Sequence, residues 1–437
     1  MSNFLISTMP ESGHVNPMLP IAAALAARGH RVRWHTGAEY RETVEATGAR
    51  FTPMRHAPRF QDLPPRRDPG DGWDAVSAVL ERLYLEPAAG QLRDYQDIVA
   101  EFPADVVFSE STSALGGYLL HELGGPPWAR LGVSMPPTLP NSAVPPLFSP
   151  GLFADTPEAP KYSSSPAAMA RNRELNHEVA HFHLRAFTNA LSALRVRLGL
   201  PPLPDGATAL DATISPFLQV QTGTPAFDYP RDELPPQVRH VGPLLPPVPD
   251  MFDPPSWWAE ATSGDRPVVH VTQGTVATDP GRLLAPTLAA LADDDVLVVA
   301  TTPAPDALGT VPANARIART IPYPSLLPNV DAMVTNGGIG GVLFALAHGV
   351  PLVATGQSED KPAICARIAH TGVGIDLRSA AAPEPARIRD AVRSVLTDPA
   401  FRRNAERVRA DFARHDPPAE AADLLERLAA TGRPVIG

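Results

Sequence analysis

The residues best suited to bind a charged ligand lie between Asp331 and Asp376. An apolar run, Ala332–Val334, leads into Asn336-Gly337-Gly338 and then into an apolar helical pattern over Ile339–Ala347. Glycines let a backbone approach an anion closely, and a helix N-terminus presents unpaired N–H groups to phosphate. The pattern therefore predicts a strand, a glycine turn and a helix that binds an anion, although such a turn can also serve tight packing alone.

A polar loop follows this helix and the next short apolar run, Leu352–Ala354. The loop runs from Thr355 to Lys361 and ends in two charged residues, Asp360 and Lys361. In open parallel sheets, ligands bind beyond the carboxyl ends of the strands. We therefore expect the loop and the glycine turn to face one crevice, although Asp360 could instead only favour the dipole of a solvated helix N-terminus.

Two titratable residues in the first part of the chain could perform acid–base chemistry. His14 follows an apolar strand pattern, Phe4–Ile6, and Glu110 follows another, Val106–Phe108. Histidine titrates near neutral pH and can take the proton of an attacking alcohol, and a carboxylate can orient such a base. We expect His14 as the base and Glu110 as its partner, against the simpler interpretation that a single histidine is structural.

The elements that would position these residues form two series of alternating strands and helices. In the first series, a helical pattern over Met18–Ala27 follows His14, and a strand pattern follows at Arg31–Thr36. In the second series, strand patterns at Pro267–Thr272 and Val296–Ala300 flank a helix. Alternation at this spacing indicates parallel α/β sheets, so we predict an α/β protein with two Rossmann-like domains that face one another.

A proline-rich segment separates the two series of strands and helices. Residues Asp228–Trp258 are dense in proline, and proline-rich segments act as semi-rigid spacers. We predict a first domain over residues 1–240, a linker over 241–262, a second domain over 263–415 and a last helix over 416–437. A further proline-rich stretch, Met135–Pro166, contains interleaved apolar residues, which favour a loop wall over an apolar ligand more than plain disorder.

Composition narrows the class of protein. The 437 residues are 44% hydrophobic and 19% charged, which is ordinary for a globular chain too long for one core. A net charge of −10 argues against a nucleic-acid surface. No apolar run nears the about 20 residues that span a bilayer, and the first residues lack the basic region of a signal peptide. The single cysteine, Cys365, argues against a disulfide framework and suits a reducing cytoplasm.

The order of features between Asp331 and Asp376 resembles the donor-binding signature of the family 1 nucleotide-sugar glycosyltransferases of GT-B fold, of the bacterial natural-product and UDP-glycosyltransferase type. In that family a His-Gly-Gly turn binds the pyrophosphate, and a Gly-Val-Pro segment follows. An acidic residue and the glutamine after it then bind the sugar hydroxyls. The matching positions here are Asn336-Gly337-Gly338, Gly349-Val350-Pro351 and Asp360-Lys361. The segment Gly13-His14-Val15-Asn16-Pro17 is similar to the family's base motif.

The resemblance implies an inverting, metal-independent hexosyltransferase of the cytoplasm, as a monomer or homodimer without a nucleic-acid partner. Its cosubstrate would be a UDP- or TDP-sugar, with no other cofactor, and its acceptor a hydroxyl, or a carbon, of a hydrophobic small molecule. The first domain would bind the acceptor, the second the donor, and the last helix would cross back to the first domain. Donor binding would use Gln273, Gly274, Thr275, Ile321, Asn336, Gly337, Gly338, Ile339, Gly340, Gly341, Asp360 and Lys361.

Several residues depart from the family pattern and leave a second hypothesis open. Asn336 replaces the histidine of the pyrophosphate turn, and Lys361 replaces the glutamine beside Asp360. Phe344 stands where the family has a ribose-binding glutamate, and Thr320 where many members have a tryptophan that stacks on the base. The alternative is a nucleotide-binding helper protein that keeps the fold and has lost catalysis.

A third hypothesis rests on His177-Glu178-Val179-Ala180-His181, within a predicted helix over Ala167–Leu198. Two histidines one helical turn apart with a glutamate between them match a zinc-protease pattern. The next acidic residue downstream is Asp205, which lies beyond two prolines, so no third ligand has suitable spacing. A zinc hydrolase is therefore a remote alternative to a helix with histidines near a pocket.

Overall fold

The computed structural model describes residues 1–63, 72–134, 142–143, 162–231, 233–247, 252–274, 279–356, 360–378 and 382–436. The first of its two sheets has the order β3-β2-β1-β4-β5-β6-β7, and every pairing in it is parallel. Its strands are β1 (Asn3–Ser7), β2 (Arg31–Thr36), β3 (Arg50–Pro53), β4 (Val106–Glu110), β5 (Trp128–Gly132), β6 (Leu218–Gln221) and β7 (Val238–His240).

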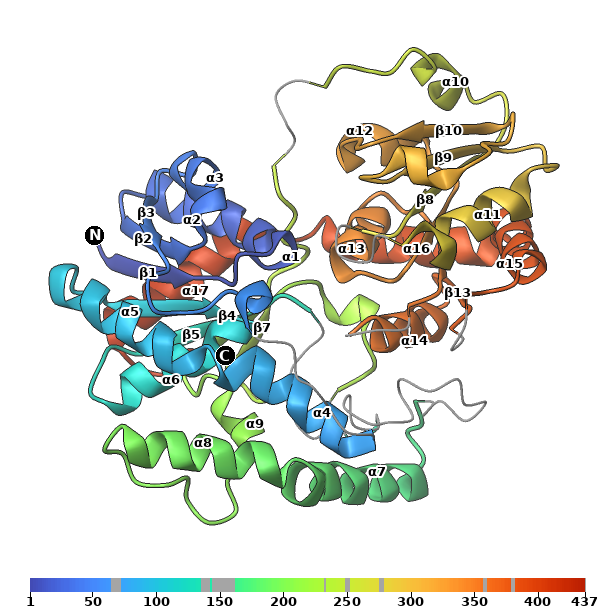
Figure 1. The fold of residues 1–437 in the computed structure, drawn as a ribbon. Coiled ribbons are helices and arrows are strands. Elements are labelled where there is room, and N and C mark those ends of the chain that lie inside the picture. Colours follow the sequence, from blue (N-terminus) through green and yellow to red (C-terminus); the bar gives the residue numbers. More distant parts are fainter. Residues whose placement is uncertain are drawn as a thin grey trace.

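The second sheet is also parallel throughout and has the order β10-β9-β8-β11-β12-β13. Figure 1 shows it in a separate lobe, coloured orange, beside the blue and green lobe of the first sheet. Its strands are β8 (Val268–Thr272), β9 (Leu297–Thr301), β10 (Ala315–Ala318), β11 (Ala332–Thr335), β12 (Leu352–Ala354) and β13 (Gly374–Asp376). The prediction of an α/β fold with two Rossmann-like units is thus confirmed.

Helices cover both faces of each sheet, as parallel strands with two buried faces require. Those of the first lobe are α1 (Ser12–Val15), α2 (Leu19–Ala27), α3 (Arg41–Glu45), α4 (Gly72–Leu80), α5 (Ala88–Glu101), α6 (Ala114–Glu122), α7 (Pro166–Glu178), α8 (Arg185–Arg197) and α9 (Ala209–Ala212). Later in the chain come α10 (Trp258–Thr262), α11 (Leu284–Leu291), α12 (Tyr323–Leu326), α13 (Ile339–Ala347), α14 (Lys361–Thr371), α15 (Pro385–Thr397), α16 (Pro399–Phe412) and α17 (Pro417–Thr431).

The last helix, α17, returns to the first lobe, where Figure 1 shows it in red beside β1. Its apolar side chains Leu424, Leu425 and Leu428 are buried in the same cluster as Phe4 and Ile6 of β1. On its outer side, Asp423 and Glu426 pair with Arg28 of the first lobe. The predicted crossing of the last helix is therefore confirmed, whereas the exact domain boundaries stay a prediction.

Two helical stretches are interrupted by π-helical turns. The helical pattern over Ala167–Leu198 breaks after Glu178, where residues Val179–His183 form a π-helical turn before α8 begins. A second π turn, Glu81–Leu85, separates α4 from α5. Such turns add one residue to the helical repeat, which a pattern of apolar residues does not reveal.

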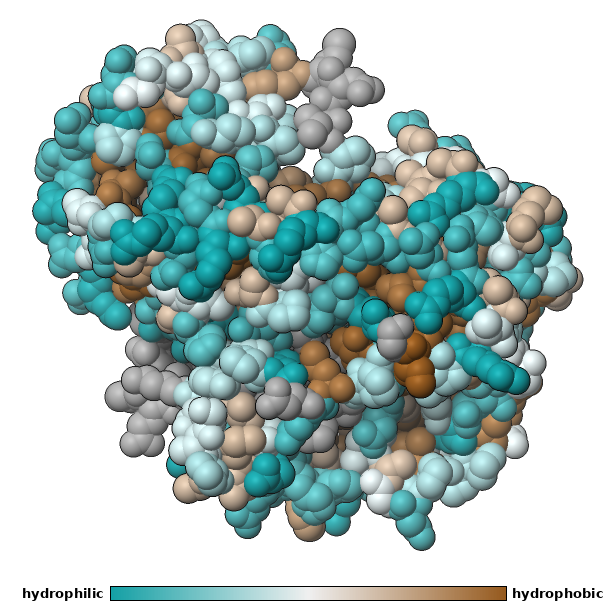
Figure 2. Space-filling view, turned by 180° about the vertical axis from the view of Figure 1, so that it is seen from behind, coloured by the Kyte–Doolittle hydropathy of each residue, from teal (hydrophilic) through white to brown (hydrophobic). Residues whose placement is uncertain are grey.

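On the face that Figure 2 shows, hydrophilic residues predominate, and hydrophobic residues lie among them in smaller groups. Within the described ranges, no helix has both the length and the apolar character needed to cross a membrane.

Candidate active site

His14 and Glu110 come from the carboxyl ends of two neighbouring strands. His14 lies in the short helix α1, which follows β1, and Glu110 is the last residue of β4. Because β1 and β4 pair in parallel, both residues lie at one edge of the sheet. His14 Nδ1 is 2.7 Å from Glu110 Oε2. The side chain of Glu110 thus reaches the imidazole directly.

The Glu110 carboxylate is fully buried and accepts hydrogen bonds from several directions. Besides His14, the backbone N–H and the hydroxyl of Thr112 donate to it, as do the Ser113 hydroxyl at 3.1 Å and the Met9 N–H at 3.2 Å. Burial alone would raise the pKa of Glu110, but the charge of His14 and these hydrogen bonds hold it well below its usual range. The carboxylate is therefore ionised and held in one position.

His14 is arranged to act as a base. Burial lowers its pKa, but the negative charges of Glu110, Asp360 and Glu11 outweigh burial and raise it above the ordinary value. A carboxylate only accepts hydrogen bonds, so Nδ1 carries the proton and Nε2 the lone pair in the neutral ring. With 25% of the side chain exposed, Nε2 can take a proton from a bound hydroxyl.

The glycine turn connects β11 to α13, as the sequence predicts. Gly337 has a φ of +79°, and a Cβ there would lie 2.8 Å from Cys365 Sγ, so glycine is required at this position. The side-chain amide of Asn336 donates to the backbone carbonyl of Gln273. This bond ties the turn to the one that follows β8.

The N–H groups of this turn differ in their availability. Those of Gly337 and Gly338 already donate to the side chains of Thr335 and Asn336, at 3.2 and 3.3 Å. The next three, from Ile339 to Gly341, lie in the first turn of α13, where no carbonyl one turn earlier in the helix can accept them. The helix start is thus the part of the turn suited to phosphate.

The turn after β8 is held by its own side chain. Gln273 Nε2 donates to the carbonyl of Asp279 at 2.7 Å, and Gln273 Oε1 accepts the N–H of Leu284 at 3.1 Å. Gly274 has a φ of +74°. Thr275 lies outside the described residues. Gln273 therefore shapes the turn, and its side chain points to the turn's own backbone.

Two further positions of the predicted donor site belong to the core of the second lobe. Ile321 is 5% exposed and Phe344 is 9% exposed, and both are part of one buried apolar cluster. The Phe344 ring packs against Tyr323, with ring centroids 5.1 Å apart. Packing explains why Phe344 is apolar, although the resemblance would place a ribose-binding carboxylate there.

Asp360 lies where the two lobes meet. It directly precedes α14, whose first residue, Lys361, is buried. The hydroxyl of Ser134, which follows β5 of the first lobe, donates to the Asp360 carboxylate. The charge of Asp360 also raises the pKa of His14, so Asp360 lies within electrostatic range of the His14–Glu110 pair.

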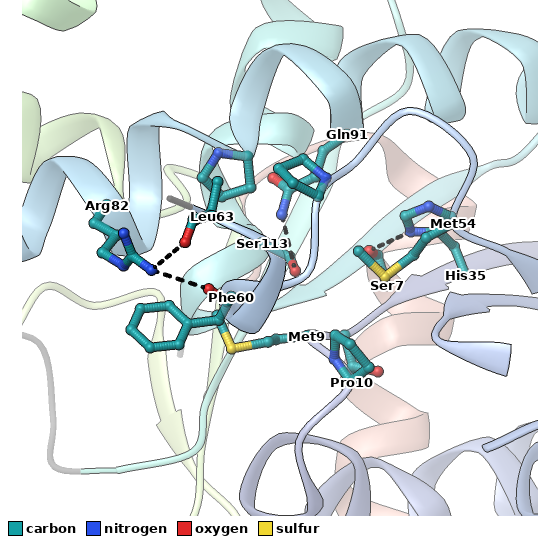
Figure 3. A pocket seen from close by; sticks show the side chains of 13 residues that line it. Ser7, Met9, Pro10, His35, Met54, Phe60, Leu63, Arg82, Gln91 and Ser113 are labelled. Atoms are coloured by element: carbon teal, nitrogen blue, oxygen red, sulfur yellow. Dashed lines mark hydrogen bonds between the residues drawn. The ribbon is translucent and has the colours of Figure 1, made fainter. Parts of the chain in front are cut away.

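A pocket in the first lobe adjoins this pair (Figure 3), and sequence analysis missed it because its wall comes from distant segments. Met9 and Ser113 line it and also donate to Glu110. Arg82 holds one wall, since Nη2 donates to the Leu63 carbonyl at 2.8 Å. Its full lining is Ser7, Thr8, Met9, Pro10, His35, Met54, Pro58, Phe60, Leu63, Arg82, Pro87, Gln91 and Ser113.

Beneath the pocket lies a buried polar network that sequence analysis also missed. The Tyr95 hydroxyl donates to Ser7 Oγ at 2.7 Å, and Ser7 Oγ is 3.0 Å from His35 Nδ1. His35 Nε2 is 3.0 Å from Asp94 Oδ2, and Asp94 accepts three backbone N–H groups of residues 55–57. The network fixes that segment against the pocket. Its one signal in the sequence is a histidine within a strand pattern.

The two histidines of the zinc-protease pattern lie together but without further ligands. The rings of His177 and His181 are 4.3 Å apart, and Glu178 is 3.3 Å from His183 instead. In the part of the chain that the structure describes, no group of three or more His, Cys, Asp or Glu residues has the geometry of a metal site. The pattern therefore does not form a zinc centre among these residues.

Comparisons with known proteins agree with this architecture. Residues 285–428 match the family described as erythromycin biosynthesis protein CIII-like, C-terminal domain. The chain is 43% identical to 4'-demethylrebeccamycin synthase of Lentzea aerocolonigenes, over 97% of this chain and 99% of that protein.

Solved structures show the same fold. The calicheamicin glycosyltransferase CalG4 superposes with a TM-score of 0.73 at 23% identity, over 99% of this chain and 100% of that one. The glycosyltransferase VinC, in complex with dTDP, superposes with a TM-score of 0.69 at 19% identity, over 98% of this chain and 99% of that one. The likeness to the synthase over nearly both full lengths establishes that the chain belongs to the family 1 natural-product glycosyltransferases, which have the GT-B fold.

Proposed function

We propose that the chain transfers a hexose from a UDP- or TDP-sugar to a hydroxyl of a hydrophobic natural product, with inversion at the anomeric carbon. One observation carries this proposal. His14 Nδ1 lies 2.7 Å from the ionised, buried Glu110 carboxylate, within electrostatic range of Asp360. A base held in this way leaves its second ring nitrogen directed at a bound nucleophile.

The proposed reaction is a single displacement. His14 Nε2 takes the proton of the acceptor hydroxyl while the oxygen of that hydroxyl forms a bond to the anomeric carbon. The bond between that carbon and the diphosphate oxygen breaks, and the nucleoside diphosphate leaves with the electron pair. Attack from the opposite face inverts the configuration, and Glu110 stabilises the imidazolium that forms.

The donor would lie against the second lobe. The N–H groups from Ile339 to Gly341 would receive the diphosphate and stabilise its developing charge without a metal ion. Asp360 would accept a hydrogen bond from a sugar hydroxyl in place of the one it accepts from Ser134. The dTDP bound by the structurally similar VinC supports a thymidine or uridine diphosphate.

The acceptor would lie against the pocket of the first lobe. Its proline, methionine and phenylalanine side chains suit an apolar ligand, and Met9 and Ser113 connect it to Glu110. The name of the similar synthase, which makes a natural product, supports an acceptor of that class. We place the reaction in the cytoplasm, because the single cysteine suits a reducing compartment.

Calorimetric titration with UDP, TDP, GDP and ADP, without added metal, tests the donor site. We expect UDP or TDP to bind with micromolar affinity and the purine diphosphates not to bind. A protein that binds none of the four would contradict it. Turnover of the matching glucose nucleotide with a panel of phenols then separates an enzyme from a helper protein that only binds nucleotide.

A further inference from the structure

Five polar side chains form one row across the first sheet. The strand register places His35, Ser7, Ser109, Arg130 and Gln219 side by side on β2, β1, β4, β5 and β6. All five are buried. They lie on the face that α5, α6 and α8 cover, since side chains two residues apart on a strand share a face and the residues before them pack there. Polar groups in such a place need partners.

The side chains at one end of the row have close hydrogen-bond partners, whereas Arg130 does not. His35 is hydrogen-bonded to Asp94, and Ser7 accepts a hydrogen bond from Tyr95. Arg130 is 8% exposed, and its Nη1 reaches Gln219 Oε1 only at 3.5 Å. Its Nε finds no acceptor, and no carboxylate among the described residues forms an ion pair with it.

Other buried arginines of this lobe do have carboxylate partners. Arg33 pairs with Glu101 at 3.3 Å, and Arg195 pairs with Glu122 at 2.8 Å. A buried charge without a partner is costly, so Arg130 is an exception that packing does not explain.

Arg130 lies on the same face of the sheet as the pocket of the first lobe. Two members of its row, Ser7 and His35, line that pocket. Burial lowers the pKa of Arg130, and Tyr84 and Glu110 are near enough to raise it in part. Tyr84 in turn is within range of the charges of Glu110 and Asp360. Glu110 already accepts hydrogen bonds from other donors, so it does not supply the partner that Arg130 lacks.

We propose that the Arg130 guanidinium binds an anionic oxygen of the acceptor, such as a carboxylate or an ionised phenol, and so holds the acceptor beside His14. The inference rests on the proposed function, because it takes the pocket of the first lobe as the acceptor site. A guanidinium is suited to this role, since it is always charged and binds a carboxylate through two parallel N–H···O bonds. The acceptor then supplies the charge that Arg130 lacks in the free protein.

A matched pair of probes tests this specificity. We would titrate 3-hydroxy-2-naphthoic acid and 3-hydroxy-2-naphthamide into the full chain saturated with UDP or TDP. Wild type should bind the carboxylate about tenfold more tightly than the amide, as expected for one charge-assisted contact. Arg130→Gln should bind the two probes equally, and Arg130→Lys should keep part of the preference. Wild type that binds both equally, or neither, would overturn the inference.

Controls separate this role from a structural one and from donor binding. Arg33→Gln removes a buried arginine that has a carboxylate partner, and it should keep the preference. Affinity for UDP or TDP should not change in Arg130→Gln, because a loss would assign Arg130 to the donor. The free Arg130→Met protein should melt no lower than wild type, because it loses an unpaired buried charge. A clearly lower melting temperature would make Arg130 structural and overturn the inference.

The two proposals can fail separately. His14→Ala should lose transfer and keep the carboxylate preference, since that preference is a binding property. If wild type transferred sugar to uncharged phenols and showed no carboxylate preference, the proposed function would stand and only the role of Arg130 would fall.

Discussion

The Nδ1 atom of His14 and the Oε2 atom of Glu110 are 2.7 Å apart, although 96 residues separate the two in the chain. The bond couples the titration of the two groups, because the anion raises the pKa of the imidazole and the imidazolium lowers the pKa of the carboxyl. Both residues belong to the first lobe, so the pair forms within a single lobe.

Glu110→Gln should change the pH dependence of transfer. The base must be neutral, so kcat/KM rises with pH through the raised pKa of His14. Without the Glu110 charge, that pKa should fall, and the acidic limb of the kcat/KM profile should move to lower pH. The plateau should also fall, because a weaker base takes the proton less readily. A profile with an unmoved acidic limb would contradict the coupling.

The same pair should contribute to stability in a defined pH window. The lowered pKa of Glu110 makes its contribution full above the ordinary value of 4.5, and it is lost as the pH falls through the lowered pKa. The raised pKa of His14 makes its contribution full below 6.5, and it is lost as the pH rises through the raised pKa. Urea unfolding of wild type and Glu110→Gln should therefore differ most between these two values.

Two adjacent glycines of the donor turn should respond differently to alanine. A Cβ at Gly338 would have Asn336 Oδ1 as its nearest neighbour, at 3.6 Å, so the folded protein can accommodate it. The methyl group would occupy space next to the helix start, and Gly338→Ala should weaken UDP or TDP binding about tenfold without loss of stability. Gly337→Ala should lower the melting temperature, because of its positive φ and its contact with Cys365. Equal melting temperatures for the two variants would contradict this assignment.

Asp360→Asn should impair use of the sugar nucleotide and leave binding of the bare diphosphate largely intact. The reason is that Asp360 would contact the sugar, whereas the start of α13 would contact the phosphates. Asp306→Asn is a suitable control, since the Asp306 side chain is 97% exposed. Calorimetry with UDP and with UDP-glucose, or with the thymidine compounds, measures both. An equal loss for both ligands would assign Asp360 to the diphosphate.

Asp228→Ala should destabilise the fold strongly. Asp228 lies between β6 and β7 and pairs with Arg367 of α14 at 2.7 Å, and both side chains are almost fully buried. Although burial raises its pKa, Arg367 and Arg231 bring it below the usual value, so the carboxylate is ionised. Its removal leaves two buried arginines unpaired and should cost about 3–5 kcal/mol in urea unfolding. Glu45→Ala, in an exposed pair with Arg41, should change stability little.

Local sequence patterns were enough to predict the fold and to predict that His14 and Glu110 lie close together. Each residue follows an apolar strand pattern, and parallel strands end at one edge of a sheet. The conformation of the Asn336–Gly341 segment could be predicted equally well, because glycine turns and helix starts are local features. The sequence did not reveal that the Gly337 and Gly338 N–H groups bond to neighbouring side chains.

Features that depend on register or on contacts between the lobes could not be predicted. The polar row that contains Arg130 exists only because five strands align their residues, and no spacing along the chain shows it. The Ser134–Asp360 contact joins residues of different lobes. The break at Val179–His183 also escaped prediction, because a π turn leaves the apolar periodicity almost unchanged.

The central claim is that His14 is the base of a nucleotide-sugar glycosyltransferase. The most direct measurement is release of UDP or TDP from the matching glucose nucleotide with a panel of phenolic acceptors, in wild type and in His14→Ala. We expect the substitution to lower turnover by about a hundredfold or more, the usual scale of general-base catalysis, while the diphosphate still binds. Turnover by His14→Ala at the wild-type rate would contradict the claim.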